Sequence, residues 1–280
     1  MSDFLTAVTD LWTRCYWPNP GGLKLLGLRG CSVADGAAIG NGARYDHFDD
    51  TLVLFDEAAG RIDHVPCTAS QPGDYWVQQA GDAPWARPGC ARFTRGVHRG
   101  EYPCLVQDDC DDRGTMAVIR LRARTFPPSY DPAGADQFDY CLETGIHIHH
   151  ADAPDEERVG IWSDGCTVVQ DSGDGERWGL VKANVWGQYA GQASFWYGIA
   201  PFAWLGDGAQ RLLWGSIDSG NQAVTQLQQL LADPNHDGAK IHVTGRFDRA
   251  TDEAYRCHQR NQGVVGTGVC ENPAWLVKPA

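Results

Sequence analysis

Short runs in which apolar residues alternate with polar or turn residues dominate positions 1–220 of the chain. The best defined of these runs are 51–55, 116–121, 144–149 and 166–169. A period of two combined with β-branched residues is typical of strands. Helical spacing occurs at 4–12 and, less fully, at 178–189. This part of the chain is therefore predicted to be a mainly β domain with one or two helices.

The pattern changes after residue 220. Apolar side chains at Val224, Leu227 and Leu231 follow helical spacing, and Asp233 with Pro234 ends that pattern. A second helical pattern runs from about residue 248 to 260. The simplest interpretation is a small all-α module of three helices. We expect a first domain over 1–205, a linker over 206–220 and this module over 221–280.

Composition narrows the class of protein. The chain has 280 residues, 42% of them apolar, with 33 Gly and a net charge of −13. The apolar content excludes a disordered or fibrous protein. The acidic surface disfavours nucleic acid and anionic membranes as general partners. Neither an export signal nor a membrane-spanning run is evident, so we expect synthesis in the cytoplasm without a signal peptide.

A reactive thiol is suggested by the segment 161–166, Ile-Trp-Ser-Asp-Gly-Cys. A nucleophilic cysteine needs a base and backbone N–H groups that can face an oxyanion. Gly165 gives the backbone before Cys166 the freedom to turn tightly. The N–H groups of Gly165 and Cys166 are thus expected to bind the oxyanion.

The base is expected from the histidine-rich run 145–150, Gly-Ile-His-Ile-His-His. Successive side chains of a strand point to opposite faces. His147 and His149 therefore share one face, and His150 points to the other. This alternation favours His149 as the partner of Cys166, with His147 beside it.

Two other interpretations of these residues remain open. Cys166 could be one of several inert buried thiols, with the histidines forming a polar strand end. Alternatively, His147, His149 and Cys166 could bind zinc, although no compact zinc motif supports this. We expect neither a metal nor a cofactor.

The run from Gly145 to Cys166 resembles the active-site signature of the L,D-transpeptidases, the YkuD-like family. In that signature an Ile-His pair on a strand precedes a Ser-His-Gly-Cys turn, and the separation between His149 and Cys166 fits its spacing. The resemblance implies a β-sandwich catalytic domain with one or two helices. It implies catalytic roles for Cys166, His149, Ser163, Gly165 and His147, and substrate contacts for His150, Asp164 and Trp162.

The match to this signature is incomplete at two positions. Asp164 stands where the family has a second histidine, and Thr167 follows Cys166 where an Arg is usual. An anion beside a thiol disfavours the thiolate. These departures bear on whether water or an amine resolves the acyl-enzyme.

The segment 221–280 resembles the three-helix peptidoglycan-binding domain found beside many cell-wall enzymes. The resemblance rests on the ordered set Val224 to Leu231, Val243 to Phe247, Gly263 to Gly268 and Trp275-Leu276. It implies a module that holds the enzyme on the wall.

Together these features predict a cysteine-dependent, endolysin-like enzyme that cleaves peptidoglycan stem peptides through a Cys166 thioester. Its partners would be stem peptides and glycan, and it would reach the wall by release or delivery. One alternative is an L,D-transpeptidase that cross-links or exchanges stem peptides. Another is a non-catalytic wall-binding or virion structural protein.

The ten cysteines add one constraint. If Cys166 is catalytic, nine remain, so they cannot all pair within one chain. Cys257 and Cys270 are the only two cysteines in the tail, so a disulfide within the tail could only join these two residues.

Overall fold

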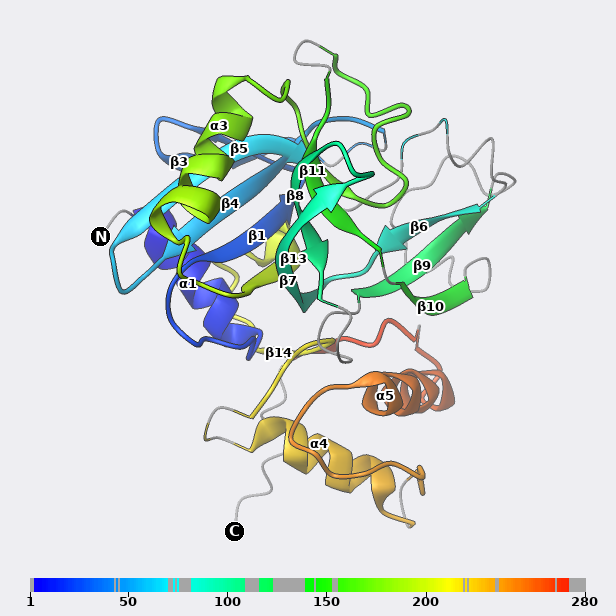
Figure 1. Cartoon of the computed structure of the whole chain (residues 1–280). Coiled ribbons are helices and arrows are strands. Elements are labelled where there is room, and N and C mark those ends of the chain that lie inside the picture. The colour runs from blue at the N-terminus through cyan, green and yellow to red at the C-terminus, as the bar shows by residue number, and fades with distance from the viewer. Residues whose placement is uncertain are drawn as a thin grey trace.

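Eight strands of this chain close into a β-barrel, as the computed structural model shows (Figure 1). The structure describes residues 3–42, 44, 46–69, 73, 75, 82–108, 116–122, 139–143, 145–152, 156–218, 220, 222–234, 237–264 and 266–271, with the backbone alone at 82–85, 116–122 and 139–143. Within these residues no helix combines the length and apolar character that a membrane crossing requires.

The barrel is mixed, because two of its strand pairs are parallel. Its strands, in order around the barrel, are β1 (Lys24–Arg29), β13 (Phe195–Pro201), β7 (Gly89–His98), β8 (Tyr102–Gln107), β11 (His147–His150), β12 (Thr167–Val169), β5 (Arg61–Thr68) and β4 (Asp50–Asp56). The pairs β1–β13 and β11–β12 are parallel, and the other six are antiparallel.

The predicted β-sandwich is therefore wrong. Leu26 of β1 lies opposite Gly198 of β13 on one side and Val53 of β4 on the other. Because the strand order that starts at β1 also returns to it through β4, the sheet closes on itself. Alternating polarity shows which face of a strand is buried, but it carries no information on which strand lies beside it. The pair β1–β13 joins the first strand of the chain to one that follows most of the others.

The other elements of region 1–205 are mostly short. They are α1 (Asp3–Arg14), β2 (Cys31–Ala34), β3 (Ala37–Gly40), β6 (Asp82–Ala86), β9 (Met116–Arg122), β10 (Asp139–Glu143), α3 (Glu176–Lys182), the π-helix η4 (Ala183–Gln188) and the 3₁₀-helix η5 (Phe202–Trp204). The predicted helices at 4–12 and 178–189 are confirmed. So are the strands at 51–55, 116–121 and 166–169, whereas that at 144–149 begins only at residue 147, and Thr144 lies outside the described residues.

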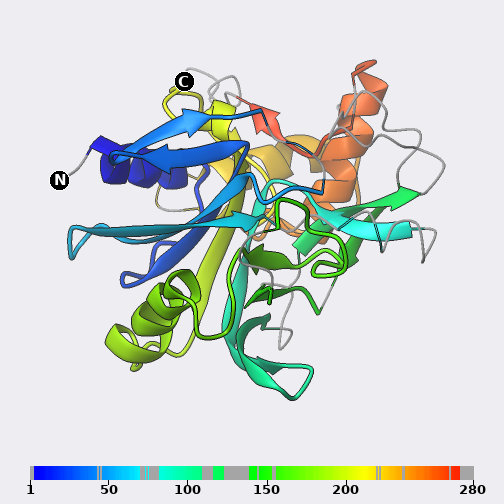
Figure 2. The same ribbon diagram turned by 90° about the horizontal axis from the view of Figure 1, so that it is seen from above.

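Two apolar clusters sandwich the barrel wall. Leu5, Val8 and Trp12 of α1 pack on the outer face of β1 and β4, against Leu26 and Val53. Their spacing places them on one stripe of the helix, which explains its amphipathic sequence. The second cluster joins the inner faces of the barrel strands to α3 and η4 through Trp178, Val181 and Val185. Helix α3 and the C-terminal helices lie on opposite sides of the barrel (Figure 1, Figure 2).

The C-terminal region contains two α-helices in its described residues, α4 (Ala223–Ala232) and α5 (Arg249–Asn261), so the predicted three-helix module is also wrong. Beyond α5 the chain forms β15 (Cys270–Glu271), which pairs with β14 (Arg211–Leu212). Burial explains this ribbon, because Leu212 and Cys270 enter the same apolar cluster as α4 and α5. Cys257 and Cys270 are free thiols in the structure and form no disulfide.

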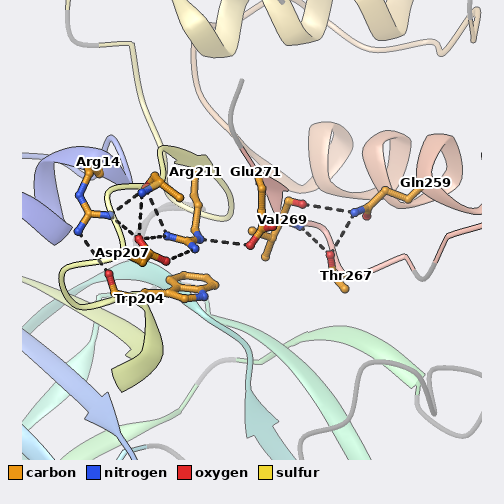
Figure 3. A network of polar contacts seen from close by, with 9 residues as sticks. Arg14, Trp204, Asp207, Arg211, Gln259, Thr267, Val269 and Glu271 are labelled. Atoms are coloured by element: carbon orange, nitrogen blue, oxygen red, sulfur yellow. Dashed lines mark hydrogen bonds and ion pairs between the residues drawn. The ribbon is translucent and has the colours of Figure 1, made fainter. Parts of the chain in front are cut away.

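Charged side chains join this region to the rest of the chain (Figure 3). Asp207 accepts hydrogen bonds from Arg14 of α1 at 2.8 Å and from Arg211 of β14 at 2.5 Å. Arg211 also lies 3.4 Å from Glu271 of β15. Residues 207–211 thus contact both the N-terminal helix and the C-terminal ribbon. The boundary at 206–220 stays a prediction.

Candidate active site

Cys166 follows a tight turn that is fixed by backbone contacts. Gly165 has φ of +89°, a left-handed conformation that favours glycine. The Ser163 hydroxyl donates to the carbonyl oxygen of Cys166 at 2.8 Å, and the N–H of Gly73 donates to the carbonyl of Ser163 at 2.7 Å. A Cβ on Gly73 would collide with the backbone of Gly160. These contacts fix the residues immediately before the thiol.

The Cys166 thiol is almost buried, with 9% of the residue exposed. Its Sγ accepts a hydrogen bond from the backbone N–H of His147 at 3.4 Å. Burial raises the pKa of Cys166 to about 11; the His147 N–H and Arg99 oppose this rise, and Asp164 adds to it. The thiol is therefore neutral at neutral pH and needs a base to react.

Strand β11 places its histidines as the alternation predicted. Ile148 points into the barrel core. In the parallel register His149 lies opposite Val168, and Val168 packs in the same apolar cluster as Cys166. Residues directly opposite on neighbouring strands share a face, so His149 and Cys166 lie on the same side of the sheet. His150 instead contacts Trp178, with ring centroids 5.5 Å apart.

The orientation of His149 is set by its own strand. Its Nδ1 lies 2.8 Å from the carbonyl oxygen of His150, which can only accept a hydrogen bond. The proton therefore sits on Nδ1, and Nε2 carries the lone pair that a general base needs. Burial, with a smaller effect of His98, lowers the pKa of His149 to about 3. The ring is neutral at all physiological pH values.

Two residues of the site were missed from the sequence, His98 and Tyr102, at the end of the β7–β8 hairpin. The His98 ring stacks on His149, with centroids 4.2 Å apart, and its Nδ1 lies 2.9 Å from Nδ1 of His147. The Tyr102 hydroxyl lies 3.4 Å from Nδ1 of His149. The Arg-Gly pair between His98 and Tyr102 indicates a hairpin turn in the sequence. No local pattern, however, links that hairpin to residues 147–166.

The remaining predicted site residues differ in their exposure and in their contacts with Cys166. Trp162 is half-buried and packs against the cluster that contains Cys166. Asp164 is exposed. Among the described residues no hydrogen bond joins Cys166 Sγ to an imidazole nitrogen, and the Ser163 hydroxyl bonds to the backbone of Cys166 rather than to a histidine ring. The roles assigned to these side chains stay predictions.

The histidine-rich side of the barrel does not form a metal centre in the part of the chain that the structure describes. No group of three or more His, Cys, Asp or Glu side chains there is arranged to hold an ion. The zinc interpretation of His147, His149 and Cys166 therefore gains no support from geometry.

Comparison of the chain with models of known families, with curated proteins and with solved structures gave no match.

Proposed function

We propose that this chain is a cysteine-dependent peptidoglycan hydrolase that cleaves stem peptides through a thioester on Cys166. One observation carries the proposal. The Cys166 thiol lies on the same side of the sheet as His149, whose Nδ1 is bonded to a backbone carbonyl so that Nε2 is free to take a proton. The spacing of these two residues, shared with the L,D-transpeptidase signature, supplies the substrate class.

The chemistry starts from a neutral thiol and a neutral imidazole. As Sγ attacks the peptide carbonyl carbon, Nε2 of His149 takes the thiol proton and later gives it to the departing amine. The N–H groups of Gly165 and Cys166 donate to no other described residue, which leaves them free for the oxyanion. Water then attacks the thioester, giving the free acid and restoring the thiol.

The C-terminal helices would hold the enzyme on its polymer. Val224, Leu227 and Leu231 of α4 pack against Phe247 and Tyr255 in an apolar cluster that also includes Tyr16 and Leu212. A wall-binding surface on this unit raises the local concentration of stem peptides at the active site without any added affinity there.

The test uses purified sacculi and soluble tetrapeptide muropeptides, with products identified by mass spectrometry. The intact protein is expected to trim or cleave stems, and Cys166→Ala is expected to lose this activity while still binding sacculi. Cys104→Ala is the matched control, because Cys104 is a buried thiol of β8 that the mechanism does not use.

The products distinguish the alternatives. New muropeptide dimers or exchanged D-amino acids would show that the enzyme catalyses transfer instead of hydrolysis. Equal products from the intact protein and Cys166→Ala would refute catalysis by this thiol, and activity that a chelator abolishes in both would favour a metal.

A further inference from the structure

The turn between β7 and β8 has an unusual residue in a demanding conformation. Arg99 and Gly100 have φ of +48° and +77°, and the N–H of Glu101 donates to the carbonyl of His98 at 2.9 Å. Positive φ at both central residues is the type I′ pattern, in which Asn-Gly is preferred. An Arg at the first position is strained, and strain of this kind concentrates at functional sites.

The turn sits at the edge of the candidate active site. Its two flanking residues, His98 and Tyr102, pair across the hairpin and contact the histidines of β11. Arg99 is exposed, and in the described part of the chain its side chain makes no hydrogen bond or ion pair. The guanidinium is therefore available to a ligand.

The charge of Arg99 reaches the reacting groups. Burial raises the pKa of Cys166, and Arg99 is one of the groups that oppose this. Burial lowers the pKa of His147, and Arg99 lowers it further. Asp164 approaches the thiol from the turn before β12, whereas Arg99 comes from the hairpin on the other side of β11. Arg99 and Asp164 thus act on the Cys166 thiol with charges of opposite sign, from two different turns.

We propose that Arg99 is a specificity-determining residue that binds a carboxylate close to the carbonyl attacked by Cys166. The planar fork of a guanidinium matches the two oxygens of a carboxylate. Asp164 would repel the same group, so the two charges fix the direction in which an anionic ligand enters. The identification of this carboxylate as part of a stem peptide rests on the proposed function. The attraction of anions to the thiol by Arg99 is independent of that function.

The test compares alkylation of Cys166 by iodoacetate and by iodoacetamide, which share a leaving group and differ in charge. The adduct is quantified on the Cys166 peptide by mass spectrometry, which separates it from the other thiols. Arg99→Asn removes the charge and suits the left-handed turn, so the fold is kept. We expect the ratio of the iodoacetate rate to the iodoacetamide rate to fall about three- to tenfold in this variant, as one nearby charge predicts. Arg99→Lys should retain most of the preference.

Glu101→Gln is the matched control, because Glu101 is an exposed charged residue of the same turn. It should leave the ratio unchanged or raise it slightly. An unchanged ratio in a folded Arg99→Asn, an equal fall in Glu101→Gln, or no reaction of Cys166 with either reagent overturns the proposal.

The outcome is independent of wall cleavage. If sacculi stay intact while the ratio depends on Arg99, the anion site stands and the peptidase proposal fails. If sacculi are cleaved while the ratio of the two alkylation rates is the same with and without Arg99, the peptidase proposal stands and the anion site fails.

Discussion

Two buried polar regions of this chain treat charge in opposite ways. Between the barrel and α5, Arg87 and Asp252 are each 4% exposed and form two hydrogen bonds, at 2.9 and 3.2 Å. Around β11 several imidazoles contact one another, as where Nδ1 of His98 lies 2.9 Å from Nδ1 of His147. Burial lowers the pKa of His98 to about 4. The first region keeps its charges by pairing them, and the second stays neutral.

The difference separates a structural contact from a candidate reactive one. A buried ion pair holds two elements in register, and removing one partner is costly because the other charge is left unpaired. Neutral imidazoles beside a neutral thiol give little stability, but they can exchange protons with a substrate. His98 and His149 therefore stay uncharged at neutral pH, whereas Arg87 and Asp252 form an ion pair.

The largest expected effect concerns the thiol. Because burial raises the pKa of Cys166 to about 11, its thiolate fraction should rise about tenfold per pH unit, or about a thousandfold from pH 7 to pH 10. The rate of iodoacetamide labelling of the Cys166 peptide measures this rise. Exposed Cys257 serves as the reference thiol. A rate that levels off below pH 8 would mean that the thiolate is already stabilised by its surroundings.

The ion pair should show the next largest effect. Asp252→Asn removes the counter-charge that the buried Arg87 shares with Arg256, at 2.9 and 3.0 Å. It is expected to lower the free energy of unfolding by about 3 kcal/mol in urea titrations. The double variant Arg87→Met/Asp252→Asn should recover part of this loss, since no unpaired Arg87 charge remains. A single variant as stable as the parent would show that the pair does not hold α5 in place.

The histidine cluster should lose stability in mild acid. The folded pKa of His149, about 3, lies below its ordinary value of 6.5. The unfolded chain therefore binds the proton first as the pH falls, and stability decreases between pH 6.5 and pH 3. At pH 5 the loss from His149 is about 2 kcal/mol. Thermal unfolding of His149→Gln across this range should show a shallower decline, and an unchanged slope would contradict a buried neutral imidazole.

The smallest effect is expected from a pair that lacks burial. Arg249 and Glu253 of α5 lie 2.8 Å apart but are 66% and 54% exposed. Arg249→Ala should change the free energy of unfolding by no more than about 0.5 kcal/mol, because water screens the attraction. A change as large as that of Asp252→Asn would mean that burial is not what distinguishes the two pairs.

Sequence patterns predicted what is local in this structure. Alternation placed Ile148 in the core and His149 on the opposite face, and helical spacing placed α1 and α5 within a few residues. The predictions that were wrong concern elements whose partners lie far away in the sequence. The barrel closes through β1 and β13, and β15 forms only because β14 lies beside it. His98 was missed for the same reason, because its hairpin reaches β11 through tertiary pairing alone.

The parallel pairing of β1 with β13 also sets a timetable for synthesis. Strand β1, which begins at Lys24, can pair with β13 only after Trp196, the partner of Lys24, has been synthesised. At ribosomal rates this is roughly 10 to 30 s, during which one edge of β1 offers unpaired backbone groups to any other strand. Helix α1, made first, covers the outer face of β1 and β4 early, whereas their inner face and that edge of β1 stay exposed until later elements are made. Nascent chains of this protein should therefore be most prone to aggregation just before residue 201 emerges.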